Sequence, residues 1–479
     1  MLVNTSPYIQ IIPIERRVSE AKAFYGRRAT FTRATGQLGF EFSGAAKNGG
    51  GLRDPAFSEN KTQPLHRWVP WIAGFSAQFV QDCFETFLKY PRKQRKPCIL
   101  DPFAGVGTTP VQAMLNGFDY VGFEINPYAA LACEVKLKSG LLDPSALEAY
   151  RCEYATATLN IGNKNGVRKP EEFRTRIPFF SPSVEKQVFA FLDFIDHIPH
   201  PSIADVFRTA FGSVMVSFSN YSYEPSLSSR PGAGKPLVEH AQVSDAILTK
   251  LDDMIADIRW AREKLSGGLS PGKGRIYKAN FLGSDNSLAS ASVDLVVTSP
   301  PYMNNYHYVR NTRPQLFWLS LVSSPKDLKV LEQGNFGKYW QTVRESAPVG
   351  LVFQHAELEK ALCKLRATRS EAGAYGGPGW ANYVASYFND CYRFVRILKR
   401  VLARGAIAVV VIGNSIIQGH ELKTDLILAD IAKDAGLEVL GVQQVRTKRV
   451  GNSITQSAVR RGNNVTATLY DSAVIARKR

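Results

Sequence analysis

Residues 294–302, with the sequence DLVVTSPPY, decide the fold of this chain. The run Leu295–Val297 is continuously apolar, which is typical of a strand buried on both faces of a parallel sheet. Two consecutive prolines cannot extend such a strand, because neither carries a backbone N–H and each has a fixed φ. The strand should therefore end at Ser299, with the prolines holding the next residues extended. Free carbonyls beside the ring of Tyr302 make this corner a receptor for a planar amine.

Working outward from this strand, residues 98–124 predict a cofactor site. The run Cys98–Leu100 predicts a short buried strand, and the glycines in the following DPFAGVGTTP segment permit a tight turn and a ligand close to the backbone. Thr109 and Gln112 fit a capping box, so a helix should begin beside Pro110. A second strand then delivers Glu124, a carboxylate placed to accept hydrogen bonds from ribose hydroxyls.

A dinucleotide-binding fold is the obvious rival for this strand, loop and helix. Its fingerprint requires a third glycine where this chain has Pro110. Asp101 would also repel a pyrophosphate, whereas it would attract a cationic amino acid group. The stretch therefore favours a cationic cofactor over a dinucleotide.

These strings resemble the motifs of the S-adenosylmethionine-dependent amino-methyltransferases. TSPPY resembles motif IV, most closely the form found in the cytosine-N4 DNA methyltransferases; DPFAGVGTT with the later GFE resembles motifs I and II, and Phe75-Ser76 resembles motif X. The resemblance covers most of residues 66–135 and 275–476. It implies an α/β fold with a Rossmann-like class I methyltransferase sheet, mostly parallel with a closing antiparallel hairpin, plus a helical insertion.

The resemblance also implies S-adenosylmethionine as the cofactor. The residues it assigns to the cofactor are Phe75, Ser76, Asp101, Phe103, Gly105, Gly107, Thr108, Glu124 and Asn280. At position 280 the family commonly has Asp, so this chain keeps an acceptor oxygen and loses a charge, and Asp285 is the fallback candidate. No metal site is expected.

The catalytic residues implied by the resemblance are Ser299, Pro300, Pro301 and Tyr302. An amine inside a duplex cannot reach such a crevice, so the nucleotide must be flipped out. Tyr302 would stack on the flipped base, while Ser299 and the Pro300 carbonyl would hold its exocyclic amine. Alignment of this kind supplies much of the acceleration in a displacement reaction. Ser299 is thus expected to act as an acceptor and not as a nucleophile.

The composition indicates which partners and which cellular location to expect. Lys and Arg outnumber Asp and Glu by 59 to 42 among 479 residues, and the resulting net charge of +17 favours a polyanionic partner. The six cysteines are scattered, which fits reduced thiols better than disulfides or zinc. No segment approaches the roughly 20 apolar residues of a membrane helix, and the N-terminus lacks a signal-peptide layout. A cytoplasmic protein, nucleoid-associated in a prokaryote, is expected.

The chain divides into six expected regions. They are a basic N-terminal arm (1–60), the first part of the core (61–140), a helical insertion that engages substrate (141–272), the second part of the core (273–322), an irregular region that could recognise the target (323–380) and the closing strands with a basic hairpin (381–479).

Nucleic-acid contacts are expected from aromatic and basic side chains in three of these regions. The candidates are Tyr221 and Arg230 in the insertion, Tyr306 and Arg310 after the proline corner, and Arg446, Lys448, Arg449, Arg460 and Arg461 at the closing hairpin.

The resulting hypothesis is a DNA methyltransferase that modifies the N4 amine of cytosine. Three alternatives stay open: an adenine-N6 DNA methyltransferase, an RNA amino-methyltransferase and a non-catalytic nucleic-acid-binding protein. No stretch is typical of a nuclease domain, so a restriction endonuclease would be a separate chain. The sequence does not specify the recognition site or the oligomeric state.

Overall fold

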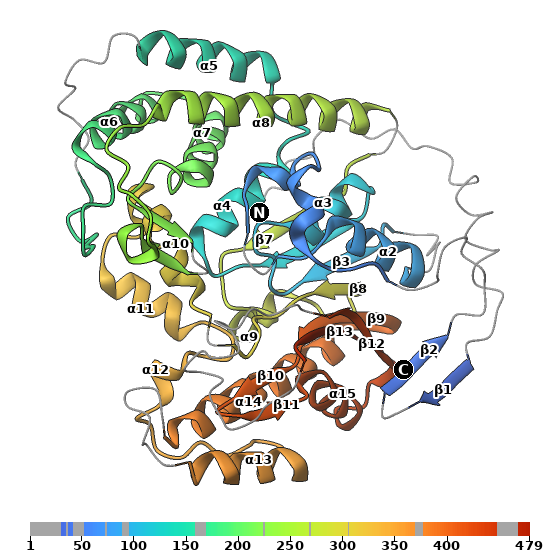
Figure 1. Ribbon diagram of the computed structural model, residues 1–479. Helices are drawn as coiled ribbons and strands as arrows, with labels where there is room; N and C mark the ends of the chain where they lie inside the picture. The colour runs from blue at the N-terminus through green and yellow to red at the C-terminus, as the bar shows by residue number, and fades with distance from the viewer. Residues whose placement is uncertain are drawn as a thin grey trace.

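A seven-stranded sheet organises the structure, a computed structural model (Figure 1). It describes residues 30–34, 37–41, 52–71, 74–88, 95–158, 169–223, 226–267, 270–304, 306–368, 377–447 and 468–479. In spatial order the strands are β12 (Glu438–Thr447), β13 (Tyr470–Arg477), β9 (Leu402–Gly413), β8 (Val293–Thr298), β3 (Cys98–Asp101), β4 (Asp119–Phe123) and β7 (Gly274–Tyr277).

The strand directions confirm the expected fold class. Strands β9, β8, β3, β4 and β7 are parallel, whereas β13 is antiparallel to both of its neighbours, β9 and β12. This is a mostly parallel sheet closed by an antiparallel hairpin. The strand β8 ends at Thr298, one residue before Ser299, as two following prolines require.

Alternate residues of the central strands face opposite layers of helices. In β8, Leu295 and Val297 pack into one hydrophobic core, and Val296 packs into the other. The same alternation runs along β9 from Ile407 to Ile412. Because both faces are covered, these strands are apolar throughout, which explains why the apolar run Leu295–Val297 predicted a buried strand.

Helices cover both faces of the sheet (Figure 1). One layer contains α2 (Ala77–Phe87), α3 (Thr108–Leu115), α4 (Pro127–Leu137) and α10 (Tyr308–Trp318). The other contains α9 (Phe281–Ser284), α14 (Gly379–Val401) and α15 (Thr424–Asp434). The candidate site lies where the parallel strands end between these layers.

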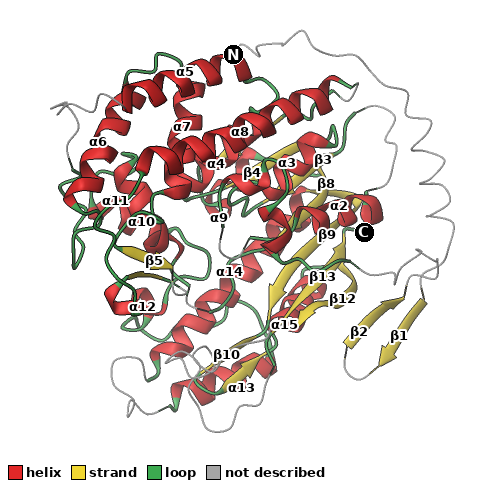
Figure 2. Ribbon diagram, turned by 45° about the horizontal axis from the view of Figure 1, so that its top comes forward, coloured by secondary structure: helices red, strands yellow, loops and turns green. Residues whose placement is uncertain are grey.

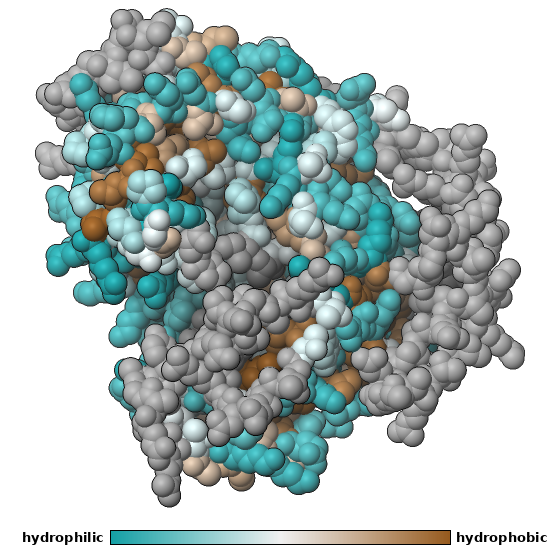
Figure 3. Space-filling view, in the orientation of Figure 1, coloured by the Kyte–Doolittle hydropathy of each residue, from teal (hydrophilic) through white to brown (hydrophobic). Residues whose placement is uncertain are grey.

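The expected helical insertion is present and packs outside the first layer (Figure 2). Its helices are α5 (Pro144–Thr158), α6 (Pro182–Asp196), α7 (Pro201–Val214) and α8 (Val243–Ser266). The segment between α7 and α8 contains the hairpin β5 (Tyr221–Tyr223) and β6 (Leu227–Ser229) and the 3₁₀ turn η3 (Pro231–Ala233). The insertion presents a mainly hydrophilic face with apolar patches toward its left edge in Figure 3.

The region 323–380, expected to be irregular, carries three helices. They are α11 (Pro325–Gln333), α12 (Trp340–Val343) and α13 (Ala356–Arg366). In α13 the buried Leu358, Leu362 and Leu365 recur at helical spacing. The expectation of an irregular region was therefore wrong for the residues of these three helices, and residues 369–376 lie outside the described residues.

The remaining elements are short. At the N-terminal side, β1 (Thr30–Ala34) and β2 (Gln37–Glu41) form a hairpin, with β2 beside β12, within the segment expected to be an arm. The 3₁₀ turns η1 (Phe57–Lys61) and η2 (His66–Trp68) precede α2. The hairpin β10 (Ser415–Ile417) and β11 (His420–Leu422) and the turn η4 (Asp285–Ser287) complete the inventory. Within the described residues, no helix is both long enough and apolar enough to cross a membrane.

Candidate active site

A cleft opens at the carboxyl ends of β3, β4, β7 and β8, the position where open parallel sheets bind ligands. Its volume is about 90 Å³, or about 860 Å³ when its open mouth is counted. The predicted site residues that line it are Phe75, Phe103, Gly105, Thr108, Glu124, Asn280, Ser299 and Pro301. We call this cleft the reaction pocket. It joins the residues predicted for the cofactor to two residues of the proline corner.

The glycine loop turns through two left-handed residues between β3 and α3. Gly105 has φ 53° and Gly107 has φ 93°, conformations that favour glycine. Gly107, and not Thr109, is the N-cap of α3, so the expected capping box is wrong. The Thr109 hydroxyl instead donates to the carbonyl of Val297 at 3.1 Å and ties the helix to β8. Gly107 itself does not line the pocket.

Glu124 bridges the glycine loop and the start of α4. Its Oε2 accepts from the Gly105 N–H at 2.9 Å, and its Oε1 accepts from the Asn126 N–H at 2.7 Å. Burial raises the pKa of this carboxyl to about 7, although the two N–H bonds lower it. Each oxygen keeps a second lone pair, so Glu124 can still accept hydrogen bonds from a hydroxyl-bearing ligand.

Asp101 lies beneath the pocket and not on its wall. The carboxyl is 1 % exposed, and its Oδ1 accepts from the Thr298 hydroxyl at 2.6 Å and the Phe103 N–H at 3.0 Å. Its Oδ2 has no hydrogen-bond partner among the described residues. Burial raises the pKa of Asp101 to about 6, partly offset by these bonds. An unpaired buried oxygen of this kind is suited to a cationic group.

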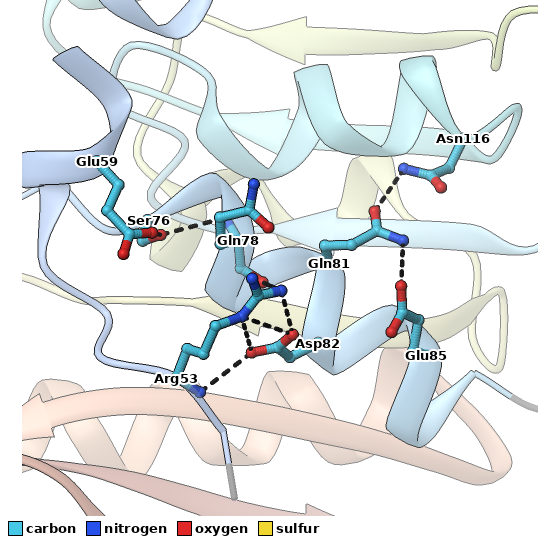
Figure 4. Close-up of polar contacts among 8 residues, drawn as sticks. All are labelled: Arg53, Glu59, Ser76, Gln78, Gln81, Asp82, Glu85 and Asn116. Carbon is cyan, nitrogen blue, oxygen red and sulfur yellow. Dashed lines mark hydrogen bonds and ion pairs between the residues drawn. The ribbon is translucent and has the colours of Figure 1, made fainter. Parts of the chain in front are cut away.

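The segment before α2 contributes Phe75 to the pocket but not Ser76. Ser76 is the N-cap of α2: its hydroxyl oxygen accepts from the Gln78 N–H at 3.1 Å, and its O–H donates to Glu59 at 3.4 Å (Figure 4). The prediction that Ser76 binds the cofactor directly therefore finds no support in the pocket lining. Trp71 and Gly74 line the pocket instead.

The turn that precedes Trp71 is held by a contact between distant parts of the chain. The buried carboxylate of Asp257 on α8 accepts from the Leu65 N–H at 2.8 Å and from the Trp68 indole at 2.9 Å. A side chain added at Gly105 would meet the Trp71 indole nitrogen at 3.3 Å. Trp71 therefore forms a close wall over the glycine loop.

The proline corner has two sides. Ser299 and Pro301 face the reaction pocket, Pro300 is buried, and Tyr302 does not line the pocket. The Tyr387 hydroxyl donates to the Pro301 carbonyl at 2.9 Å and fixes the corner.

Tyr302 packs against the ends of β9 and β13. A Cβ added at Gly413 would lie 3.1 Å from the Tyr302 ring. Burial and the neighbouring Asp471 raise the pKa of the Tyr302 hydroxyl well above its ordinary value, while its hydrogen bond with Ser299 lowers it. The Tyr302 side of the corner thus lies toward β9 and β13, whereas Ser299 and Pro301 face the reaction pocket.

Several residues that line the reaction pocket were not predicted from the sequence. Ile125 directly follows Glu124, and Tyr308 lies in the polar and aromatic stretch after the prolines, so neighbouring motifs could have indicated both. Asn335 and Phe336 lie in the region expected to be irregular, and the Phe336 ring packs edge-on against Phe103 at 5.0 Å.

The nucleic-acid candidates are dispersed. Tyr221 is 8 % exposed and stacks on Phe179 at 5.4 Å, so its ring is a core residue and the expectation that it stacks on a base was wrong. The Arg230 Nε donates to the Pro236 carbonyl at 2.7 Å, and Arg446 lies 3.8 Å from Asp54. Arg310 is exposed on α10.

Tyr306 lines a different cavity, described below. The remaining candidates, Lys448, Arg449, Arg460 and Arg461, lie outside the described residues.

The known proteins that are similar in sequence to this chain include methyltransferases. No family model matches it. The Type II methyltransferase M.BsoBI of Geobacillus stearothermophilus is 24% identical over 84% of this chain and 84% of its own length, and the Type II methyltransferase M.AvaI of a Nostoc species is 22% identical over the same shares. These relatives confirm the resemblance to methyltransferases predicted from the motifs.

The solved structures are more distant. A putative DNA modification methylase from Thermus thermophilus, solved with S-adenosyl-L-methionine, is 15% identical and aligns over 42% of this chain and 53% of its own, with a TM-score of 0.21. That score is too low for the alignment to bear on the site.

Proposed function

We propose that this chain is an S-adenosylmethionine-dependent DNA methyltransferase whose acceptor is the N4 amine of cytosine in a flipped-out nucleotide. The observation that carries the proposal is the reaction pocket, in which the glycine loop and Glu124 meet Ser299 and Pro301. The relatives named Type II methyltransferases align over most of the chain and support DNA as the substrate.

The cofactor fits the donor and acceptor groups of the pocket. Glu124 has acceptor capacity for ribose hydroxyls, and the orphaned Oδ2 of Asp101 suits the electrostatics of a cation. Gly105 has no side chain and Trp71 lies close to where one would project, so the loop and the indole together form one wall of the pocket. When bound, S-adenosylmethionine supplies a methyl group on a positively charged sulfur. Phe75, Phe103, Thr108 and Asn280 complete the cofactor residues.

The chain's own contribution to catalysis is orientation. The Ser299 hydroxyl and the Pro300 carbonyl accept hydrogen bonds from the exocyclic amine of the base, while Tyr302 stacks on the ring. Pro301 is held by Tyr387, so the corner is rigid before substrate arrives. Rigid alignment of the nitrogen lone pair of the amine with the methyl carbon of the cofactor raises the rate by several orders of magnitude.

The net charge of +17 supports a nucleic-acid substrate. A base within a duplex cannot reach a pocket at the strand ends, so flipping is required. The Thr-Ser-Pro-Pro-Tyr form of the corner favours cytosine N4 over adenine N6. A restriction endonuclease acting with this methyltransferase would be a separate chain.

Mass spectrometry of nucleosides tests the proposal. DNA from cells that express the protein should gain N4-methylcytosine, and DNA from cells that express Ser299→Ala at the same level should not. N6-methyladenine without N4-methylcytosine would change the assigned base while keeping the chemistry. Methyl transfer to RNA and not to duplex DNA would overturn the DNA assignment.

A further inference from the structure

A second cavity of about 290 Å³ lies between the segment before α2 and helices α4, α7 and α10. We call it the insertion pocket, because α7 and the β5 strand supply part of its wall. Its aromatic lining residues are Phe57, Trp71, Tyr128, Tyr223, Tyr306 and Tyr308. The volume is near the lower end of the range for small-molecule sites.

Within the described part of the chain, four buried polar atoms on this wall have no hydrogen-bond partner. The hydroxyls of Tyr128 and Tyr306, the Nδ2 of Asn311 and the Oε1 of Gln315 have no hydrogen bond to any described residue. Tyr128 is 2 % exposed, and Asn311 and Gln315 are each 4 % exposed. Burial raises the pKa of the Tyr306 hydroxyl, and the nearby Asn311 amide lowers it, yet the two groups do not meet hydrogen-bond geometry.

The two amides are oriented by their other atoms. The Asn311 Oδ1 accepts from the Leu227 N–H at 2.8 Å, and the Gln315 Nε2 donates to the Gly212 carbonyl at 3.1 Å. Asn311 and Gln315 are four residues apart on α10, so the amide with the unpaired N–H₂ donor and the amide with the unpaired carbonyl acceptor share one face of the helix. Leaving such groups buried and unpaired costs about 1–3 kcal/mol each.

Adjacent donor and acceptor groups match the edge of a nucleobase. Each base presents an acceptor beside a donor on its Watson–Crick edge, which is free in an unpaired base, and its flat faces stack on aromatic rings. The insertion pocket offers both kinds of group, and the exposed Lys61 at its rim supplies a positive charge for a phosphate. An apolar ligand would leave the amides unpaired.

The insertion pocket is separate from the reaction corner. Trp71 and Tyr308 line both cavities, whereas Ser299 and Pro301 line only the reaction pocket. A base within the insertion pocket is therefore divided from the proline corner by these two aromatic side chains.

We propose that the insertion pocket binds a second, unpaired nucleobase of the substrate nucleic acid, which is held there while a different base is methylated. The inference rests on the proposed function, because it assigns the occupant to the same substrate. It makes the insertion a part of substrate binding and not only a cover for the sheet.

Filling the pocket tests this inference. Val216 lines the cavity, so Val216→Phe adds bulk there, while Val330→Phe makes the same change on α11, where Val330 is 67 % exposed. The probes are fluorescently labelled single-stranded and duplex oligonucleotides of mixed sequence, measured by anisotropy, and S-adenosylmethionine, measured by calorimetry. Thermal melting of each variant checks that it is folded.

We expect Val216→Phe to weaken oligonucleotide binding about fivefold to 100-fold, the loss of one stacked base, with cofactor binding unchanged. Val330→Phe should bind like the parent chain. Folded Val216→Phe that binds oligonucleotides as tightly as Val330→Phe would overturn the inference, as would a loss confined to cofactor binding.

If Val216→Phe does not fold, the double variant Tyr128→Phe/Tyr306→Phe provides the test. It deletes only hydroxyls without a described partner and should weaken oligonucleotide binding without lowering stability. Unchanged binding by this folded variant would overturn the inference. Pocket-dependent binding by a protein that transfers no methyl group would instead refute the proposed function alone.

Discussion

The reaction pocket and the insertion pocket share two walls, Trp71 and Tyr308, but differ in the state of their polar groups. In the reaction pocket Glu124 is oriented by two backbone N–H groups, and the Pro301 carbonyl accepts from Tyr387. In the insertion pocket the free atoms of Tyr128, Tyr306, Asn311 and Gln315 lie at a cavity without a described partner.

The difference separates two kinds of binding site. A site whose acceptors are held by the backbone keeps its geometry with or without a ligand, which suits catalysis. A site whose buried donors and acceptors are unpaired gains most when a ligand satisfies them. Changes in the reaction pocket should therefore affect turnover, and changes in the insertion pocket should affect substrate affinity.

The largest expected effect comes from Ser299→Ala. Loss of the hydroxyl removes one acceptor for the amine, so the rate of methyl transfer should fall on the order of 100-fold. Single-turnover kinetics with labelled cofactor measures the rate, and calorimetry checks that the cofactor still binds. Ser217→Ala is the control, because Ser217 is exposed and donates to the Val214 carbonyl. A Ser299→Ala enzyme with parental kcat would break the assigned role.

Gly107→Ala should have the next largest effect. The new Cβ would meet the Cys133 sulfur at 2.6 Å at a φ of 93°, so we expect a loss of about 2–4 kcal/mol of unfolding free energy. Gly234→Ala is the matched control: it has φ 71° with nothing within 4 Å, and it should lose about 1 kcal/mol. Denaturant titration measures both, and equal losses would show that packing at the loop does not matter.

Cofactor affinity should rise with pH. Burial raises the pKa of Glu124 to about 7 and that of Asp101 to about 6, so both carboxyls are largely protonated at about pH 5.5 and largely ionised at about pH 8. Only the ionised groups attract a cation. Calorimetric Kd values should therefore fall across this window by up to about tenfold per pH unit for each proton released.

The stability of the free protein should change in the opposite direction. Both folded pKa values exceed the ordinary values of 4.5 and 3.8. The two carboxyls therefore contribute their whole stabilisation to the unfolding free energy below the ordinary pKa values, and this stabilisation is lost as pH rises through 6 to 7. The Glu124→Gln variant should bind the cofactor more weakly, and its affinity should no longer rise near pH 7, where Glu124 ionises in the parent chain. A Glu124→Gln profile identical in shape to the parent would exclude Glu124 as its source.

Sequence alone predicted the elements that are local and fully buried. The strands β3, β4 and β8 are largely apolar runs ended by polar, glycine or proline residues, so their ends, and the reaction pocket they form, follow from the chain order. The α13 pattern was equally readable, since Leu358, Leu362 and Leu365 have helical spacing, and it was missed. The start of α3 was misplaced because Thr109 bonds to a neighbouring strand and not to its own helix.

The insertion pocket could not be predicted in this way. Its wall joins Trp71, Tyr128, Tyr223 and Tyr308, which lie in separate elements far apart in the chain. Trp68, which precedes the wall residues Val69–Trp71, donates to Asp257 on α8, a contact that no local pattern encodes. Tyr221 shows the converse error, because an aromatic residue in a polar stretch is here part of the core.

The smallest expected effect separates the two pockets most directly. Tyr387→Phe deletes the donor to the Pro301 carbonyl and should lower the unfolding free energy by about 1 kcal/mol. Tyr128→Phe deletes a hydroxyl with no described partner, so the free protein should keep its stability within about 0.5 kcal/mol. Denaturant unfolding of the two variants measures both changes. A formed hydrogen bond typically contributes about 0.5–1.5 kcal/mol, so a loss of about 1 kcal/mol or more in Tyr128→Phe would mean that this hydroxyl is already satisfied without a ligand. The contrast between a self-sufficient pocket and one completed by its substrate would then fail.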